Sequence, residues 1–250
     1  MEHKKVSVLG VSFDNKTKET FLEELMDRVN HKQKSFVVTA NPEIVMYAKK
    51  DPAYMSLMKE ADYIIADGIG IIKGSKILGT PIVERVAGYD LMLALLEEAN
   101  KQGSRVYLLG AQEEVLQNTV KTVHERYPSI NLVGARNGYF DFSDASIIES
   151  IQATQPDMVF VALGYPKQEQ WIQQYMTTAS KGLLMGVGGS FDVLSGKSKR
   201  APKIFIQLNM EWLYRLIKQP YRLKRMMALP YFLHEVKNEK KQVSKNSPKN

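Results

Sequence analysis

Short apolar runs alternate with amphipathic stretches along most of this chain, and this alternation limits the possible fold more than any other feature. The runs cover residues 6–9, 36–39, 63–66, 105–109, 131–133, 158–163 and 183–187. Stretches with helical periodicity lie between them, at 18–30, 42–50, 88–101, 113–127, 143–154 and 167–177. Strands that are apolar on both faces and separated by helices are typical of parallel sheets. The sequence therefore predicts an α/β fold with a mainly parallel, Rossmann-like sheet covered by helices.

The pattern changes to helix alone beyond residue 195. Residues 196–250 carry 14 lysines and arginines against 3 acidic residues, a net charge of +11, whereas residues 1–195 carry a net charge of −4. Apolar residues are interleaved with these cations at helical spacing, which is typical of a segment that lies on an anionic membrane surface. We therefore expect an α/β domain at 1–195 and a basic, membrane-associating helical appendage at 196–250, with a disordered end from about 240.

Two alternatives compete with membrane association of the appendage. One is a helical hairpin that packs on its own domain and leaves a basic face in water. The other is nucleic-acid binding, which the composition disfavours because a surface that follows phosphates has no need of so many aliphatic side chains. No uncharged apolar run reaches the ~18 residues that a membrane-spanning helix needs, so any contact with a membrane is expected from one side.

Polar residues follow several of the predicted strands. Ligands of parallel sheets bind outside the carboxyl ends of the strands, so these positions are the first candidates for chemistry. Asp67 ends an apolar run and precedes Gly68, so its carboxylate should project into the crevice at this edge, where a base can meet a hydroxyl group. An aspartate before glycine is also a common turn residue, and this alternative stays open.

Metal and thiol chemistry find little support in the sequence. The chain has no cysteine, which excludes thiolate nucleophiles and cysteine-bound metals. No Asp-x-Asp pair follows a predicted strand, and Asp141 and Asp144 are more typical of a helix cap than of a metal site. We expect neither a metal nor another cofactor. A departing diphosphate would then have to be met by cations and backbone N–H groups.

The appendage offers such cations. Arg215, Arg222 and Arg225 fall within one broad face of a continuous helix, although Pro220 can bend it. The alternative is that they are ordinary solvated arginines.

Five motifs in order along the chain resemble those of the WecG/TagA/CpsF glycosyltransferase family. They are TANPE at 39–43, ADGIG at 66–70, ERVAGYD at 84–90, GYPKQE at 164–169 and GVGGSFD at 186–192, followed by Arg-Ala-Pro at 200–202. The resemblance runs from about residue 5 to 235, and the basic tail is similar to that of the TagA/TarA branch. It implies inverting, metal-independent transfer of N-acetylmannosamine from UDP to the 4-hydroxyl of N-acetylglucosamine on diphospho-undecaprenol, in the linkage unit of wall teichoic acid.

The resemblance also implies roles for individual residues. Asp67 corresponds to a general base, and Thr39, Arg85 and Gln168 complete the implied catalytic set. The implied substrate contacts are Asn41, Arg215, Arg222 and Arg225. Further candidates for nucleotide contact, chosen because they flank the same crevice, are Gly138, Tyr139, Gly188 and Asp192.

The implied partners are a UDP-sugar, a polyprenyl-diphosphate-linked N-acetylglucosamine and an anionic membrane, without nucleic acid. The implied location is cytoplasmic, peripheral on the inner face of the cell membrane. Self-association through the apolar tail is possible in the absence of lipid. Two other functions remain open. One is transfer from another UDP-sugar, such as the uronate of N-acetylmannosamine. The other is a non-catalytic membrane adaptor that binds a nucleotide.

Overall fold

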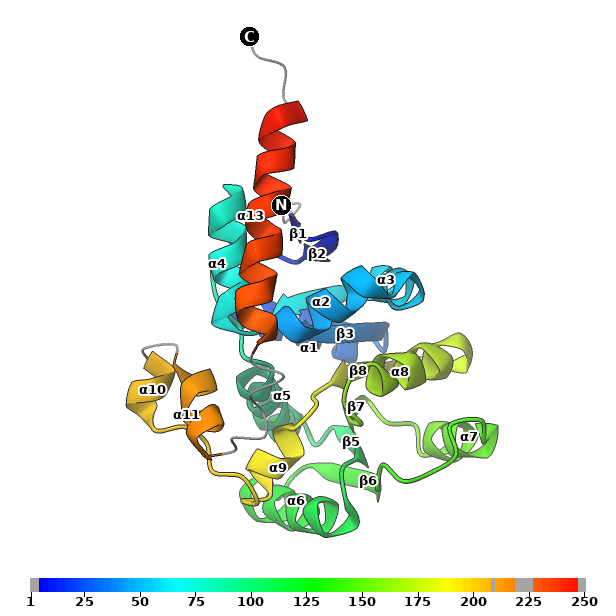
Figure 1. Ribbon diagram of the computed structural model, residues 1–250. Helices are drawn as coiled ribbons and strands as arrows, with labels where there is room; N and C mark the ends of the chain where they lie inside the picture. The colour runs from blue at the N-terminus through cyan, green and yellow to red at the C-terminus, as the bar shows by residue number, and fades with distance from the viewer. Residues whose placement is uncertain (1–4, 208–209, 219–226, 247–250) are drawn as a thin grey trace.

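The computed structural model describes residues 5–207, 210–218 and 227–246 of the chain (Figure 1). Its central sheet is made of β3 (Lys34–Ala40), β4 (Tyr63–Ala66), β5 (Arg105–Gly110), β6 (Asn131–Arg136), β7 (Met158–Ala162) and β8 (Gly182–Gly186). The strand order is β4-β3-β8-β7-β5-β6, and each neighbouring pair is parallel. The predicted α/β fold with a mainly parallel sheet is therefore confirmed.

Helices cover both faces of this sheet. In β3, Phe36 and Val38 point into one apolar layer and Val37 points into the other. The first layer holds α2 (Pro42–Lys50), α3 (Pro52–Lys59), α7 (Ala145–Ala153) and α8 (Lys167–Thr178), and the second holds α1 (Lys18–Asn30), α5 (Gly88–Gln102), α6 (Glu113–Arg126) and α9 (Ser190–Leu194). Since alternate strand residues face opposite sides, two apolar faces require the continuous apolar runs seen in the sequence.

The chain leaves two neighbouring strands in opposite directions. After β3 it enters α2, in the first layer, and after β8 it enters α9, in the second layer. Such a divergence marks the carboxyl ends of the two strands as the edge where α/β proteins bind their ligands. The third strand at this end of the sheet, β4, leads into α4 (Ile69–Leu78).

The first predicted strand does not join the parallel sheet. It forms β1 (Val6–Val8), which pairs with β2 (Val11–Phe13) in a separate antiparallel hairpin. The two turn residues, Leu9 and Gly10, have φ values of +52° and +83°. Positive φ at both central positions is typical of the two-residue turn that matches the twist of a hairpin, which is why the chain reverses here.

The C-terminal segment is helical, as predicted, but its helices differ in their surroundings. It contains α10 (Lys203–Gln207), α11 (Glu211–Lys218) and α13 (Ala228–Asn246). Figure 1 shows α13 running alongside α4. Phe232 and Val236 of α13 are fully buried in the first apolar layer. A Cβ built on Gly74 of α4 would lie 3.0 Å from the Phe232 ring, so the glycine allows the two helices to approach closely.

Polar contacts also tie α13 to the α/β body. The carboxylate of Glu239 accepts a hydrogen bond from the backbone N–H of Leu9 at 3.1 Å, and Lys49 of α2 forms an ion pair with Glu235. The helix continues to Asn246, past residue 240, where the sequence indicated the start of a disordered end. α13 is therefore part of the packed structure of the body.

α10 and α11 keep much of their apolar surface in water. They contact each other through Phe205 and Tyr214, whose ring centroids are 5.5 Å apart. Ile204 and Ile217 are 61% and 62% exposed, and Trp212 is 39% exposed. In the part of the chain that the structure describes, no helix has both the length and the apolar character needed to cross a membrane.

Candidate active site

Asp67 lies at the carboxyl edge of the sheet, as the sequence predicts. It directly follows β4, and its backbone N–H donates to the carbonyl oxygen of Ala40 at the end of β3, at 3.0 Å. Asp67 is therefore adjacent to Asn41, which follows Ala40. Asp67 is half-buried.

Small residues bring the starts of α2 and α4 together around this aspartate. Gly68 has a φ of +95°, a conformation that favours glycine, and it turns the chain into α4. A Cβ on Gly70 would lie 2.5 Å from the ring of Pro42, the first residue of α2. A larger residue at position 70 would push the helices apart, so the ADGIG motif serves the close packing that fixes the position of Asp67.

Asn41 has a structural task in addition to its predicted role. It is the N-cap of α2, and its Oδ1 accepts a hydrogen bond from the backbone N–H of Ile44 at 3.0 Å. Such caps satisfy one of the free N–H groups at a helix start. The oxygen serves the helix, and the Nδ2 group supplies two further N–H donors for a contact with substrate.

Thr39 fastens β3 to the end of β8. Its hydroxyl donates to the carbonyl oxygen of Gly186 at 3.0 Å, and its side chain is nearly fully buried. A Cβ on Gly88, the first residue of α5, would approach the Thr39 methyl group to 2.9 Å. The hydroxyl is thus held under α5, where it fixes the end of β8.

Gln168, near the start of α8, fastens the same region from the other side. Its Oε1 accepts a hydrogen bond from the backbone N–H of Gly188 at 3.0 Å, and its Nε2 donates to Oε1 of Glu169 at 2.7 Å. The side chain is 2% exposed. Two of the residues proposed for catalysis, Thr39 and Gln168, therefore hold the loop that leaves β8.

Arg85 lies next to the end of β4. The backbone N–H of its neighbour Val86 donates to the carbonyl oxygen of Ala66 at 3.2 Å, which places this loop beside Asp67. The Arg85 guanidinium pairs with Glu211 of α11 at 3.7 Å, and both side chains are 15% exposed. The structure thus brings together Asp67, Asn41, Thr39, Arg85 and Gln168 at the ends of β4, β3 and β8. It also attaches α11 to this group.

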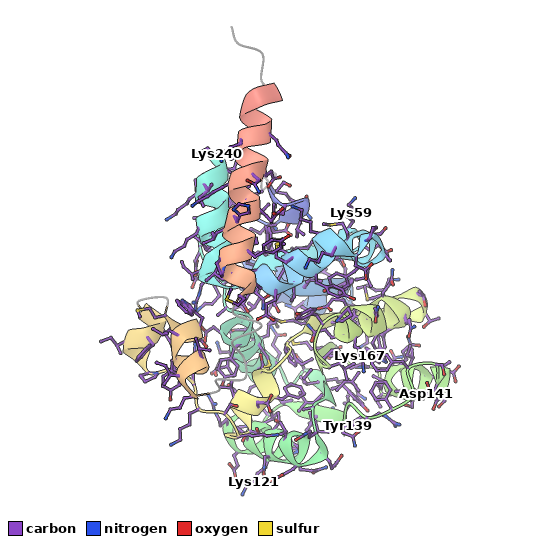
Figure 2. The ribbon with its side chains drawn as sticks, viewed as in Figure 1. Lys59, Lys121, Tyr139, Asp141, Lys167 and Lys240 are labelled. Carbon is purple, nitrogen blue, oxygen red and sulfur yellow. The ribbon has the colours of Figure 1, made fainter. Side chains whose placement is uncertain are left out.

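The other predicted contacts lie farther along the same edge. Gly138 and Tyr139 follow β6, and the Gly138 N–H donates to the carbonyl oxygen of Ala111, just after β5, at 2.9 Å. The Tyr139 side chain is 72% exposed (Figure 2). Asp192 lies in α9, 4.0 Å from the ammonium group of Lys197. Gly138 and Tyr139 thus lie after the end of β6, and Asp192 lies in the helix that follows β8.

The predicted arginines of the appendage are only partly covered by the structure. Arg215 belongs to α11, but the position of its side chain is not described. Arg222 and Arg225 lie outside the described residues. Their proposed contacts with a diphosphate therefore stay predictions.

Asp141 and Asp144 have local structural partners. Asp141 accepts hydrogen bonds from the backbone and hydroxyl of Ser143, and Asp144 is the N-cap of α7, where it accepts from the N–H of Ser146. The predicted helix cap is confirmed. Within the described ranges, no group of three or more histidine, aspartate or glutamate side chains could hold a metal ion.

Glu169 is a residue of the site that the sequence did not single out. It is fully buried between α8 and α3, and burial raises the pKa of its carboxyl group to about 7. The hydroxyl of Tyr54 faces it, and burial together with the charge of Glu169 raises the pKa of Tyr54 far above its usual value. The signal in the sequence is a carboxylate beside Gln168 on the apolar face of a helix.

A second residue that the sequence did not single out is Arg200, which links the start of the C-terminal segment to α5. Its guanidinium forms an ion pair with Asp90, in the first turn of α5, and lies 5.1 Å from the centre of the Tyr89 ring. The two ends of the ERVAGYD motif are thus connected to the C-terminal segment, through Arg85 and through Asp90.

Comparisons with known proteins agree with the resemblance found in the sequence. The model of the glycosyl transferase WecG/TagA/CpsF family matches residues 6–246. Proteins of Staphylococcus aureus strains MW2, NCTC 8325 / PS 47 and MRSA252 are each 39% identical over 243 residues, which covers 96% of this chain and 95% of theirs. Each of these relatives is named N-acetylglucosaminyldiphosphoundecaprenol N-acetyl-beta-D-mannosaminyltransferase.

Proposed function

The chain belongs to the WecG/TagA/CpsF family of glycosyl transferases, and we propose that it transfers N-acetylmannosamine from UDP to N-acetylglucosaminyldiphosphoundecaprenol. The observation that carries this proposal is the 39% identity to named mannosaminyltransferases across almost the full length of both chains. The product would carry the β-1,4 linkage of the wall teichoic acid linkage unit.

The chemistry requires a base for the acceptor hydroxyl, and Asp67 is our candidate. A half-buried carboxylate at the carboxyl end of β4 can reach a ligand in the crevice while its backbone stays fixed to β3. It would remove the proton of the 4-hydroxyl as this oxygen attacks the anomeric carbon from the side opposite the UDP group. The bond to the β-phosphate oxygen then breaks, and the configuration at the anomeric carbon inverts.

The leaving group is a diphosphate, so it needs positive charge. Arg85 is the cation beside Asp67 whose position is described, and we assign Arg215, Arg222 and Arg225 to the same task. The attachment of α11 to Arg85 supports this assignment, because it holds part of the C-terminal segment at the edge of the sheet. For the nucleotide we assign Gly138, Tyr139, Gly188 and Asp192, which lie along the same edge.

Membrane contact is assigned to α10 and α11. The acceptor carries an undecaprenyl chain, which resides in a bilayer, and its diphosphate lies at the surface. Ile204, Trp212 and Ile217 expose apolar surface, while the segment from 196 to 250 has a net charge of +11. Apolar side chains together with cations favour peripheral binding to an anionic leaflet. We accordingly propose that the protein works at the inner face of the cell membrane.

A transfer assay with a panel of donors tests the proposed function. The purified full chain is mixed with a short-chain lipid-diphosphate N-acetylglucosamine and, in separate reactions, UDP-N-acetylmannosamine, its uronate and UDP-N-acetylglucosamine, with and without EDTA. Mass spectrometry should detect one added N-acetylhexosamine with UDP-N-acetylmannosamine, and EDTA should leave the rate nearly intact. Preferential transfer from another donor, or no product from any donor, would contradict the proposal.

A further inference from the structure

Two buried side chains connect the interior of the first apolar layer to the loop after β8. Glu169 is fully buried, and its Oε1 accepts a hydrogen bond from Nε2 of Gln168 at 2.7 Å. The Oε1 of Gln168 accepts from the backbone N–H of Gly188 at 3.0 Å. The hydrogen bonds thus run from a carboxyl group in the core, through one amide, to a backbone group at the carboxyl edge of the sheet.

The carboxyl group decides which way the amide of Gln168 points. The Oε1 atom of the carboxyl group accepts a hydrogen bond, so the NH₂ end of the amide must face it. The carbonyl end then faces the N–H of Gly188. Without the carboxylate the amide can turn over, and its NH₂ end would face another donor. A buried donor or acceptor left without a partner is costly, so the Gly188 loop would move.

The loop has little freedom around this contact. A Cβ built on Gly186 would lie 2.7 Å from Nε2 of Gln168, so the amide packs directly against the backbone of the strand end. On the opposite side, the hydroxyl of Thr39 donates to the carbonyl oxygen of the same glycine. The position of Gly188 therefore depends on the amide of Gln168 on one side and on β3 on the other.

The surroundings of Glu169 argue against a role in a salt bridge. The groups that influence its ionisation are Gln168, Tyr54 and its own backbone N–H, in addition to burial. Tyr54 comes from α3, and Tyr47 and Tyr165 lie close to Tyr54. All of these neighbours are uncharged, so hydrogen bonds, among them the one from Gln168, are the polar contacts of Glu169 in the described part of the chain.

From this geometry we infer that Glu169 is a positioning residue for the transfer reaction, which acts through Gln168 to set the backbone of Gly188 for donor binding. This inference rests on the proposed function, because it takes the loop after β8 as part of the donor site. Glu169 touches neither the donor nor the acceptor, and its effect should appear in the KM for the UDP-sugar.

The test compares Glu169→Leu with Glu169→Gln in the full chain. Glutamine keeps an oxygen that can accept from Gln168, whereas leucine keeps the volume and removes the acceptor. The first measurement is the hydrogen-exchange rate of the Gly188 amide by NMR, which needs no substrate. We expect roughly 10- to 100-fold faster exchange in Glu169→Leu, the range that corresponds to a lost buried hydrogen bond, and a rate close to wild type in Glu169→Gln.

The second measurement is steady-state kinetics of the same variants. The KM for the UDP-sugar should rise about tenfold or more in Glu169→Leu, with a smaller change in kcat and in the KM for the acceptor, and Glu169→Gln should restore most of the affinity.

Gly186→Ala tests the same contact from the other side. Its methyl group should displace the Gln168 amide while Glu169 stays intact, and it should raise both the Gly188 exchange rate and the donor KM. The double variant Gly186→Ala/Glu169→Leu should add little to either single change, because both break the same connection. The single variant Gly186→Ala also keeps the inference testable if Glu169→Leu does not fold.

Four outcomes separate the possibilities. Faster exchange together with a raised donor KM, both restored by glutamine, would support the inference. Wild-type exchange of Gly188 in both Glu169→Leu and Gly186→Ala would overturn it. Faster exchange without any change in donor KM would also overturn it, since Glu169 would then hold the Gly188 loop without affecting donor binding. If the wild-type chain transfers no sugar while exchange responds as expected, the proposed function fails and the hydrogen-bond connection stands.

Discussion

The helices of the C-terminal segment fall into two regions that differ in what covers their apolar residues. In α13, Phe232 and Val236 are fully buried against α4 and α2. In α10 and α11, Ile204 and Ile217 are more than 60% exposed, and Trp212 is partly exposed. Both regions are basic and amphipathic, so composition alone makes them look like one appendage. The two regions differ in whether the body covers their apolar faces, and their similar charge does not reveal this difference.

The packing of α13 limits where the chain can be divided. A boundary at 196 separates the sequence by composition, but α13 lies beyond that boundary and packs on the body. A chain truncated at 196 would lose α13 together with α10 and α11. It would expose the faces of α4 and α2 that Phe232 and Val236 now cover.

The largest expected effect is on stability, and it belongs to α13. Phe232→Ala should lower the free energy of unfolding by about 3–5 kcal/mol, since it leaves a cavity between α13 and α4. Ile217→Ala, in α11, is the matched control and should change this energy by less than about 0.5 kcal/mol. Denaturant titration of both variants measures the difference. Equal losses of stability in the two variants would mean that α13 is no more a part of the body than α11.

The next effect uses the carboxyl group of Glu169, which is buried in the same apolar layer as α13. Its pKa is about 7 in the folded chain against an ordinary value of 4.5. Its neutral form favours folding, so this contribution is complete below about pH 4.5 and is lost as the pH rises to 7. Glu169→Gln does not titrate, and it should be more stable than wild type above pH 7, by roughly 3 kcal/mol at most.

Denaturant titrations at pH 4.5 and pH 8 check this sign. The two proteins should be similar at the lower pH and diverge at the higher one. A stability difference that is the same at both values would contradict the buried, neutral carboxyl group. If α13 belongs to this layer, its amides should follow the same pH dependence in hydrogen exchange, and those of α11 should not.

Membrane binding should depend on α11, whereas stability depends on α13. Trp212→Ser and Ile217→Ser should each reduce the free energy of binding to anionic vesicles by about 1.5–3 kcal/mol if these side chains enter the bilayer. Vesicle sedimentation measures this binding, and the stability of the fold should change little. Val83→Ser is a matched control, because Val83 is 63% exposed but lies in the α/β body. Binding of the wild type should also weaken as salt rises. An equal loss of vesicle binding in Val83→Ser would show that any exposed apolar side chain contributes, and not those of α11 in particular.

The smallest effect concerns the link between the two regions. The pair of Arg85 and Glu211 is mostly buried at a separation of 3.7 Å, and a double-mutant cycle with Arg85→Gln and Glu211→Gln should give a coupling of about 0.5–1 kcal/mol in the local stability of α11. Hydrogen exchange of the α11 amides measures it. Zero coupling would mean that α11 is held at the sheet edge by other contacts.

The sequence predicts the parallel sheet well because strands buried on both faces must be apolar throughout, as in β4, β7 and β8. It does not reveal α4, because the glycines of this helix break the helical signal and are explained only by close packing against Pro42 and Phe232. The β1–β2 hairpin is missed because its turn contains Leu9, a residue that rarely adopts a positive φ.

The candidate site divides in the same way. The position of Asp67 at the carboxyl edge can be predicted because strand ends and a following glycine are visible in the sequence. The sequence does not predict that Thr39 and Gln168 hold the loop after β8, since their partners are backbone groups 147 and 20 residues away. Glu169 looks like an ordinary helix carboxylate until the fold buries it. Whether α13 packs on the body depends on which surface the other helices leave uncovered, and that depends on the whole fold.

We propose that the carboxyl edge formed by β4, β3 and β8 is the active site, with Asp67 as its base. The most direct measurement is the rate of sugar transfer by Asp67→Asn, together with its affinity for UDP. Asp62→Asn is the control, because Asp62 precedes β4 at the opposite end of the same strand. We expect Asp67→Asn to lose roughly 10²- to 10⁴-fold in rate while UDP affinity and the control stay close to wild type. Near-normal transfer by Asp67→Asn would show that Asp67 is not the base.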